Sequence, residues 1–427
     1  MASDTATLAE ACELIVDCPH STPVWTDSGE VVLRNENIKN GRLDQSSPSF
    51  TDAKHFADRI RRAVPRPGDL VFTREAPMGE VCMIPNGLRC CLGQRQVLLR
   101  PSIRFDNHYL LYAIQSPAVQ HQIRWNEGTG STVSNVRIPI LKSLRVPAPS
   151  KPEQVRTAAV LKSLDDRIDH NRALAANLEA IARALFKSWF VDFDPVRAKA
   201  AGEAPPGLAP DLAALFPVRF VDSELGEIPE GWRAGKIGDV CRNVREGCAA
   251  SEIGADDFYV GLEHVDRRSL TLWQKGTGSD AISNKSRFEA GDLLFGKLRP
   301  YFHKVVIAPC DGICSTDILV IRSKADKERA FTHLALFQDE VIQFVSDASG
   351  GTRMPRTNWE TLAAFRIVVA PSEVRAAFDD LVRPLCEAAT VAVAESRVLA
   401  RMRDLLLPRL ISGKLRVEDA EAALDAA

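Results

Sequence analysis

The sequence predicts an α+β protein in which two pseudo-symmetric, mixed and β-rich bodies are separated by two long helices that form an antiparallel coiled coil. Three observations support this fold class: the chain is built twice, each copy leads to a heptad-patterned helix, and charged loops recur at matching positions. The predicted parts are a first body at 1–150, a helix at 151–195, a linker at 196–227, a second body at 228–371, a helix at 372–413 and a C-terminal tail at 414–427.

The internal repeat rests on three landmarks that occur in the same order in both halves. They are GDLVF at 68–72 with GDLLF at 291–295, the loop at 130–135 with that at 351–356, and the proline-terminated strand at 144–150 with that at 365–372. The first pair is offset by 223 residues (291 − 68) and the second by 221 (351 − 130). Chance explains one match but not three in order. A pseudo-twofold protein is suited to bind two separated half-sites or two copies of a partner.

Composition places the chain among ordinary multi-domain globular proteins. It has 427 residues, of which 45% are hydrophobic and 26% charged. No apolar run is long enough to span a membrane and the N-terminus lacks a secretion signal, so we expect a cytoplasmic protein without membrane contact. Ten cysteines without regular spacing fit a reducing compartment and no disulfides. The net charge of −2 does not decide the partners, because basic residues can gather on one face.

The two predicted helices carry apolar residues in alternating steps of three and four, which is typical of a coiled coil. The positions are Leu161, Leu164, Ile168, Ala175, Leu178, Ala182, Leu185 and Trp189 in the first helix, and Phe378, Leu381, Leu385, Ala388, Ala392, Leu399, Met402 and Leu406 in the second. Asn171 and Glu395 each occupy a slot near the middle of the pattern. Antiparallel packing would bring them to similar heights, either as a buried polar layer that fixes register or as side chains that reach solvent. Pro384 should kink or start the second helix.

The first helix ends in more aromatic surface than one two-helix contact requires, so part of it is a candidate docking surface. The candidate partner interface comprises Leu185, Phe186, Trp189, Phe190, Leu406 and Leu410. Packing against the chain's own bodies is the alternative. A helix of about 40 residues spans roughly 60 Å and would hold the two bodies apart. The alanine- and proline-rich stretch at 198–217 that follows indicates a linker or a loosely ordered crossover.

Neither body carries a recognisable catalytic or metal-binding motif. The sequence lacks a phosphate-binding loop, a dinucleotide fingerprint, a His-Glu-x-x-His pair and a nucleophile elbow, which argues against an enzyme. Cys12, Cys18 and His20 lack the paired spacing of a zinc site. Cys90 and Cys91 should point to opposite faces of a strand. We therefore predict no catalytic residues, no bound metal and structurally buried thiols.

Polar loops at corresponding places in the two bodies have the composition of a DNA-binding surface. In such loops Lys and Arg contact phosphates, while Arg and Gln have forked groups that suit guanine and adenine edges. Glycine-containing loops before each helix could bring backbone amides to phosphate, or could serve only to reverse the chain. The candidate DNA-binding residues are Thr73, Arg74, Gln94, Arg95, Ser131, Thr132, Lys297, Arg299, Tyr301, His303, Lys304, Arg353 and Arg356. For any single charge, a solvated loop is the simpler interpretation.

With these features in place, the chain resembles the DNA-specificity subunits of type I restriction-modification systems. The segments that carry the resemblance are 185–195, 228–232, 291–304 and 405–415, in the order body, helix, body, helix. The resemblance implies that each body is a target-recognition domain for one half of a bipartite, asymmetric DNA sequence. It implies that the helices set the half-site spacing and bind two modification subunits, with two restriction subunits completing the complex. S-adenosylmethionine, ATP and Mg would be bound by those partners and not by this chain.

The first body carries TREAP at 73–77 where the second carries GKLRP at 296–300, so the two half-sites should differ. A coiled-coil scaffold that binds only proteins is the first rival, and it predicts no salt-dependent DNA binding. An enzyme with an unrecognised site is the second, and it predicts activity without partners. A specificity subunit of a modification-only system or of a fused restriction-methylation enzyme is the third, and this sequence does not separate it from the leading interpretation.

Overall fold

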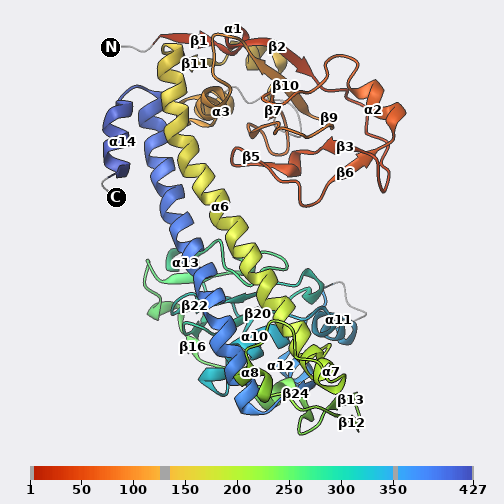
Figure 1. Cartoon of the computed structure of the whole chain (residues 1–427). Coiled ribbons are helices and arrows are strands. Elements are labelled where there is room, and N and C mark those ends of the chain that lie inside the picture. Colours follow the sequence, from red (N-terminus) through yellow and green to blue (C-terminus); the bar gives the residue numbers. More distant parts are fainter. Residues whose placement is uncertain (1–3, 126–134, 350–353, 426–427) are drawn as a thin grey trace. The chain divides into compact units, whose positions relative to one another are not determined.

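The structure, a computed structural model, describes residues 4–125, 135–349 and 354–425 (Figure 1). The chain folds into two units. Unit 1 comprises Met1–Ile168 and Val398–Ala427, and unit 2 comprises Asp169–Arg397. The long helices α6 (Lys151–Phe190) and α13 (Ser372–Ile411) each contribute one part to each unit. Within the described residues, no helix is long and apolar enough to cross a lipid bilayer.

Unit 1 is built on a four-stranded antiparallel sheet in the order β2-β10-β7-β8 and a three-stranded sheet in the order β6-β3-β9, in which β3 and β9 run parallel. Its strands are β1 (Thr5–Thr7), β2 (Cys12–Asp17), β3 (Glu30–Leu33), β4 (Ile38–Lys39), β5 (Arg42–Leu43), β6 (Ser49–Thr51), β7 (Leu70–Thr73), β8 (Val81–Met83), β9 (Cys90–Leu92), β10 (Gln96–Pro101) and β11 (Arg145–Pro147). Its shorter helices are α1 (Leu8–Ala11), α2 (Ala53–Arg59), α3 (Asn107–Gln115), α4 (Pro117–Trp125), α5 (Ile138–Ser143) and α14 (Val417–Asp425).

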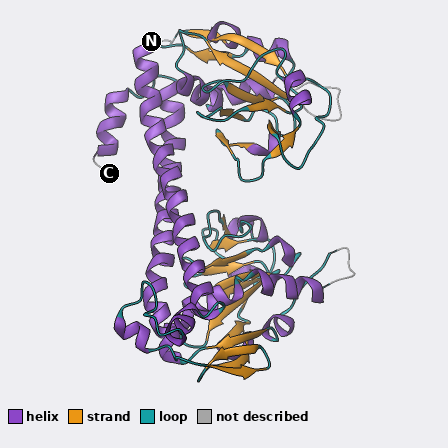
Figure 2. Ribbon diagram, turned by 45° about the vertical axis from the view of Figure 1, so that its right-hand side comes forward, coloured by secondary structure: helices purple, strands orange, loops and turns teal. Residues whose placement is uncertain are grey.

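Unit 2 is built on a four-stranded antiparallel sheet in the order β15-β23-β20-β21 and a five-stranded sheet in the order β16-β19-β22-β17-β18, in which β17 and β22 run parallel. Figure 2 shows the strands in orange and the helices in purple. Its strands are β12 (Phe220–Ser223), β13 (Gly226–Pro229), β14 (Arg233–Lys236), β15 (Cys241–Val244), β16 (Gly247–Cys248), β17 (Phe258–Val260), β18 (Gly276–Thr277), β19 (Lys285–Phe288), β20 (Leu293–Gly296), β21 (Val305–Ile307), β22 (Gly312–Cys314), β23 (Ile318–Ser323) and β24 (Arg366–Val369). Its shorter helices are α7 (Asp194–Ala200), α8 (Pro210–Ala214), α9 (Ile237–Val240), α10 (Arg329–Leu336), α11 (Asp339–Ala348) and α12 (Trp359–Ala363).

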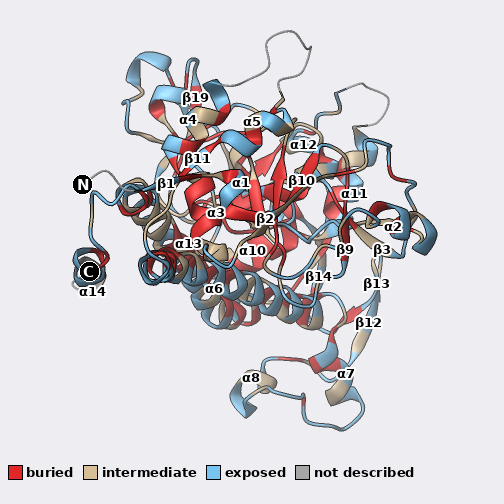
Figure 3. Ribbon diagram, turned by 90° about the horizontal axis from the view of Figure 1, so that it is seen from above, coloured by how far each residue is buried: buried red, intermediate tan, exposed pale blue. Residues whose placement is uncertain are grey.

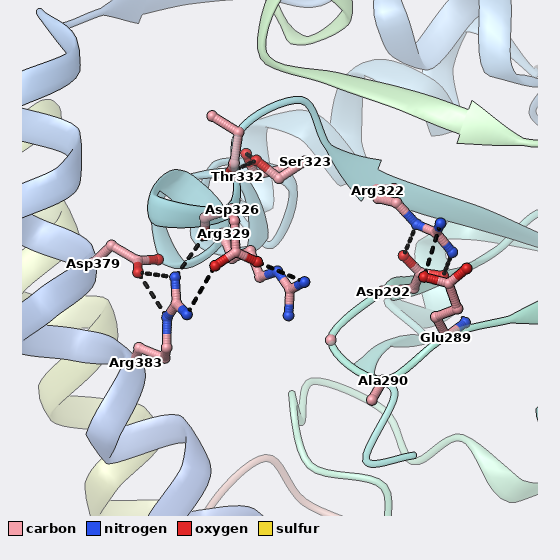
Figure 4. Close-up of polar contacts among 12 residues, drawn as sticks. Glu289, Ala290, Asp292, Arg322, Ser323, Asp326, Arg329, Thr332, Asp379 and Arg383 are labelled. Atoms are coloured by element: carbon pink, nitrogen blue, oxygen red, sulfur yellow. Dashed lines mark hydrogen bonds and ion pairs between the residues drawn. The ribbon is translucent and has the colours of Figure 1, made fainter. Parts of the chain in front are cut away.

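The four-stranded sheets of the two units have the same strand order, which confirms the duplicated topology. The backbone conformation and the hydrogen bonds of the repeated Gly-Asp pair explain why both copies keep these two residues. Gly68 has φ +85° and Gly291 has φ +83°, a conformation that favours glycine. The aspartate that follows each glycine is buried and accepts two hydrogen bonds from an arginine of the neighbouring central strand: Asp69 from Arg100 at 2.7 and 2.8 Å in unit 1, and Asp292 from Arg322 at 2.7 and 2.7 Å in unit 2 (Figure 4).

The hydrophobic core of each unit lies between its four-stranded sheet and its helices. The central strands β7 and β20 are buried along their whole length, as expected for strands covered on both faces. In Figure 3 buried residues are red, and β10, the neighbour of β7, lies among them. Polar residues begin several of the shorter helices in both units. The side chains of Asp52, Asp106 and Asn358 cap α2, α3 and α12 by accepting a backbone amide hydrogen at 2.8–2.9 Å. Such caps stabilise a helix by about 1 kcal/mol each.

The cysteines are free thiols, and eight of the ten are buried. Cys90 and Cys91 pack into different hydrophobic clusters of unit 1, which confirms that they point to opposite faces of β9. Burial raises the pKa of the Cys90 thiol to about 12, so it stays protonated and unreactive near neutral pH. No group of three or more His, Cys, Asp or Glu side chains suited to a metal ion occurs in the described part of the chain.

The first helix uses the predicted heptad face, but the second is turned relative to the prediction. In α6, the predicted positions Leu161, Ile168, Ala175 and Ala182 are buried. In α13, Leu381 and Ala388 are exposed, whereas the buried positions include Val382, Ala389, Val393 and Ser396 together with the predicted Phe378 and Ala392. The prediction was wrong there because α13 carries apolar residues on two faces, and periodicity alone does not say which face is inside.

Asn171 and Glu395 meet in unit 2, which confirms the predicted antiparallel register of the two helices. The Asn171 side-chain amide donates to Glu395 Oε2 at 3.0 Å, and Asn171 is almost fully buried. This supports the polar-layer alternative over side chains that merely reach solvent. Such a layer favours one register, because a slip along the helices would leave the amide or the carboxylate facing apolar side chains.

Three segment predictions differ from the structure. Pro384 lies exposed inside α13, which begins at Ser372, so this proline does not start the helix. The predicted linker at 196–227 contains α7, α8 and β12, and Phe216 of this segment packs edge-on against Trp189 with a ring distance of 5.0 Å. The predicted C-terminal tail contains α14, whose Val417 and Ala420 are buried in the core of unit 1. Composition missed both segments because only a few buried apolar residues anchor each of them.

Candidate nucleic-acid interface

In unit 2, the structure brings together two loops that the sequence identified separately. The tip between β20 and β21 lies beside the chain that leads into α12. Arg299 N–H donates to Pro355 C=O at 2.8 Å, and Thr357 N–H donates to Lys297 C=O at 3.0 Å. Lys297 N–H in turn donates to Asp317 C=O at 2.8 Å. Backbone hydrogen bonds therefore hold three separate segments of unit 2 in one surface, which we call the unit 2 tip.

Cationic and aromatic side chains lie on the unit 2 tip. No hydrogen bond or ion pair joins the Lys297 ammonium to the residues that the structure describes, and Tyr301 is 53% exposed. Arg356 is also exposed, and one guanidinium nitrogen lies 3.3 Å from Asp317 Oδ1. The Arg299 guanidinium carbon lies 5.9 Å from the centre of the Phe302 ring. Free and weakly paired cations of this kind can bind phosphates, because little existing interaction must be broken.

The backbone at the tip is constrained. Arg299 has φ +50° and His303 has φ +51°, on either side of the short helix η5 (Pro300–Phe302). Non-glycine residues adopt this left-handed conformation at a cost of about 1–2 kcal/mol each. The strain is held by the hydrogen bonds of the tip and keeps the Arg299 and Tyr301 side chains on one short, rigid turn.

His303 and Lys304 support this turn from inside, which corrects their prediction as DNA-contacting residues. The His303 ring is buried against Phe337 at a ring distance of 4.4 Å, and its Nδ1 lies 3.2 Å from Asp339 Oδ1. Burial lowers the pKa of the His303 imidazole and of the Lys304 ammonium. Lys304 Nζ donates to Leu262 C=O at 2.5 Å.

Arg267 is a further cation of the unit 2 tip that sequence reasoning missed. It is exposed, and its guanidinium carbon lies 3.9 Å from the centre of the Phe302 ring, a cation–π contact. Arg267 comes from the loop before β18, outside the repeated landmarks. The only sequence signal was the adjacent pair Arg267 and Arg268.

An open hollow of about 430 Å³ adjoins the tip, and Lys297 lines it. Further cations in its wall are Arg245 and Lys285, and Trp359 and Glu360 lie near the start of α12. Arg245 pairs with Glu360 at 2.9 Å, and Lys285 Nζ donates to the carbonyl and hydroxyl of Ser283. Lys297 is therefore the cation of this wall that is most available to an incoming phosphate.

The corresponding surface of unit 1 is built by the same backbone hydrogen bonds. Arg74 N–H donates to Arg95 C=O at 2.8 Å, and Val136 N–H donates to Arg74 C=O at 3.1 Å. Arg74 thus takes the place of Lys297, and Arg95 takes the place of Asp317. Arg95 is positively charged and Asp317 is negatively charged, so the same backbone arrangement presents different chemistry in the two units.

Two of the predicted unit 1 residues are internal, which corrects their predicted role. Thr73 is fully buried, and its hydroxyl oxygen accepts from Glu80 N–H at 3.0 Å. The Arg74 guanidinium donates to Asp17 at 2.8 and 3.0 Å and to Val136 C=O at 2.9 Å, so it is already satisfied. Both side chains shape the turn after β7 and do not extend from it.

The turn between β9 and β10 presents the remaining unit 1 candidates. Arg95 has φ +64°, its side chain is half exposed, and its Nε lies 3.1 Å from Glu75 Oε2. The Gln94 side-chain amide donates to His20 C=O at 2.7 Å. Sequence reasoning missed a nearby exposed pair in this unit, in which the Arg34 guanidinium lies 5.3 Å from the Trp25 ring centre. Ser131, Thr132 and Arg353 lie outside the described residues.

The predicted partner interface is largely internal. Phe186, Trp189 and Phe190 are buried in the core of unit 2, where Leu185 packs against them. Leu410 is buried and Leu406 half-buried in the core of unit 1. This corrects the prediction: the aromatic excess at the end of α6 fills the chain's own core. Within unit 1, α13 exposes the large apolar side chains of Val398 and Leu405, at 59% and 60% exposure and seven residues apart. We call these two residues the outer stripe.

Comparisons with known proteins agree on one family. The model of the type I restriction modification DNA specificity domain matches residues 24–180. The chain is 27% identical over 363 residues to the type I restriction enzyme MjaIX specificity subunit of Methanocaldococcus jannaschii, covering 82% of this chain and 78% of that protein. It is 25% identical over 421 residues to the HindI specificity subunit of Haemophilus influenzae, covering 86% and 90%. The S subunit of a type I restriction-modification system from M. genitalium shares the fold, with a TM-score of 0.57 at 15% identity over 96% of each chain.

Proposed function

Because the chain belongs to the family of DNA-specificity subunits of type I restriction-modification systems, we propose that it reads a bipartite, asymmetric DNA target with one half-site per unit. The observation that carries this proposal is the pair of equivalent surfaces with different charges. The same backbone hydrogen bonds place the half-exposed Arg95 in unit 1 where unit 2 has Asp317, and Lys297 in unit 2 where unit 1 has Arg74, whose guanidinium is bound by Asp17. A conserved scaffold with exchanged side chains is what two dissimilar half-sites require.

Within this proposal, a narrower set of residues contacts DNA. Lys297, Arg299, Tyr301 and Arg356 do so in unit 2, joined by Arg267, and Gln94 and Arg95 do so in unit 1, joined by Arg34 and Trp25. These side chains are exposed or half-buried at the two surfaces. Exposed cations supply phosphate affinity, and forked Arg and Gln side chains supply base selection.

The chain itself catalyses nothing in this proposal and acts in the cytoplasm, where its DNA target lies. Two modification subunits bring S-adenosylmethionine and methylate adenine, and two restriction subunits bring ATP, Mg and DNA cleavage. This division of labour follows from the family. The specificity subunit contributes only the choice of site.

The experiment that tests the function is to co-express the chain with a type I modification (methyltransferase) subunit from the same source and map methyladenine across plasmid DNA. We expect a split motif with a constant gap between two unlike halves. If the two proteins form no complex and no motif is methylated, DNA specificity is wrong and the protein-binding scaffold replaces it.

The outer stripe is the proposed docking surface for the modification subunit. At about 100° per residue, Val398 and Leu405 lie nearly opposite the buried face of α13, so they do not serve the helix pair itself. We expect Leu405→Asp to weaken assembly with the modification subunit about tenfold or more, because it buries a charge in an apolar contact. The measurement is size-exclusion chromatography with titration of the partner.

The matched control for this variant is Ala176→Asp, which adds the same charge at an exposed position of α6 away from the outer stripe. It should assemble normally. Equal assembly of both variants with the modification subunit would remove the outer stripe as the docking surface.

A further inference from the structure

A loop of unit 2 is held by a carboxylate from one long helix. The loop, residues 266–275, runs between the short helix η3 (Leu262–His264) and β18, and we call it the clamped loop. Glu179 of α6 accepts backbone hydrogen bonds from Leu270 N–H at 3.1 Å and Thr271 N–H at 2.8 Å. The hydroxyls of Ser269 and Thr271 donate to the same carboxylate. Two backbone amides and two hydroxyls therefore converge on one charged group.

The other long helix holds the same loop through its carbonyl groups. Arg397 of α13 donates from Nε to Trp273 C=O at 3.2 Å, and its terminal nitrogen donates to Leu272 C=O. The Arg172 guanidinium of α6 lies 5.6 Å from the Trp273 ring centre. The helix pair thus offers an acceptor to the loop's amides and a donor to its carbonyls. This complementarity orients the loop, because a shift of one residue would break both sets of bonds.

The clamped loop also contacts the turn at residues 299–303 of the unit 2 tip, which we call the DNA-reading turn. Arg268 N–H donates to His303 C=O at 2.9 Å, and the Arg268 guanidinium pairs with Asp339 at 3.0 Å. Arg267 stacks on Phe302, the ring that Arg299 also approaches. A chain of direct contacts therefore leads from Glu179, through the clamped loop, to the turn that presents Arg299.

We propose that Glu179 and Arg397 are positioning residues for the second half-site: the helix pair orients the DNA-reading turn of unit 2 through the clamped loop. This inference rests on the proposed function and deepens it. The helices then do more than space the two half-sites, since they also set the geometry with which one of them is read. A charged group that accepts several hydrogen bonds holds backbone more firmly than apolar packing, because each bond has a preferred direction.

The test compares Glu179→Gln with Glu387→Gln in the complex with the modification subunit. The first change removes the charge and one acceptor at the clamp, and the second removes the charge of an exposed carboxylate of α13. Methylation is measured on the cognate site and on sites with one base changed in either half, where the unit 2 half is the one that Arg299→Ala affects. We expect selectivity at the unit 2 half to fall about tenfold in Glu179→Gln, with the other half unchanged. Arg397→Gln should behave in the same way.

A second measurement does not depend on DNA. Backbone amide exchange should become faster in Glu179→Gln both at residues 269–271 and at residues 299–304, whereas Glu387→Gln should match the wild type. Faster exchange confined to 269–271, an equal loss of selectivity at both halves, or identity with Glu387→Gln would overturn the inference. If the wild type methylates no split motif, the proposed function fails and the exchange at 299–304 alone decides the clamp.

Discussion

Trp189→Ala is expected to lower the free energy of unfolding of unit 2 by about 3–5 kcal/mol, the usual cost of removing a large buried aromatic side chain. The Trp189 ring packs edge-on against Phe216 at 5.0 Å and lies 5.4 Å from the Phe378 ring, so three separate segments of the chain lose contacts at once. Urea unfolding, with amide exchange to identify which unit opens, measures the effect. Unit 1 should keep its stability.

The control for this variant is Leu174→Ala, a truncation on the same helix at a partly exposed position, which we expect to cost less than about 1 kcal/mol. The comparison also decides between the two interpretations of the aromatic cluster. A Trp189→Ala variant that kept its stability but failed to bind the modification subunit would restore the docking role that the sequence suggested.

The repeat was readable from sequence because its landmarks are residues that the backbone requires. A glycine at φ +85° or +83° cannot be replaced by another residue without backbone strain. The buried aspartate that follows each glycine accepts hydrogen bonds from an arginine of the neighbouring strand. The arginines themselves, Arg100 and Arg322, could not be paired with these aspartates in advance. Such pairing depends on which strands are neighbours in the sheet, and short-range pattern does not specify strand order.

The lengths and the antiparallel register of the two long helices were predictable, but the face of α13 that is buried was not. Asn171 and Glu395 stood out as polar interruptions, and their hydrogen bond bears out the antiparallel arrangement. The face of α13 was less certain because Leu381 and Val382 are both apolar neighbours, yet Leu381 is exposed and Val382 buried. A helix with one apolar face for its own partner and another at the surface has two valid heptad patterns. Only packing chooses between them.

The sequence predicted which loops form the candidate site, but not which of their side chains are free to contact DNA. Arg74 and Lys297 occupy equivalent positions and looked equivalent in sequence. Arg74 is neutralised by Asp17, which comes from a distant strand, whereas Lys297 has no such partner among the described residues. Availability depends on long-range partners, so it emerges only with the fold.

Arg299 and Lys297, two side chains of the unit 2 tip, should respond differently to substitution. Arg299→Ala should weaken recognition of the unit 2 half-site by about 1–3 kcal/mol and relax base preference there, as expected for a guanidinium that reaches a base edge. Lys297→Gln should weaken binding to cognate and altered sites alike and should reduce the slope of binding against salt by about 1, as expected for one phosphate contact. The measurement is a salt titration of DNA binding by the assembled complex.

Arg219→Ala is the matched control, because Arg219 is an exposed, ion-paired cation directly before β12, outside the unit 2 tip. It should leave both selectivity and salt slope unchanged, and all three variants should assemble normally with the modification subunit. If Arg299→Ala instead changes only the salt slope, Arg299 contacts phosphate, and base selection must pass to its neighbour Tyr301. Normal binding and methylation at every site would exclude the tip as a DNA-reading surface, since Arg299 lies on its most constrained turn.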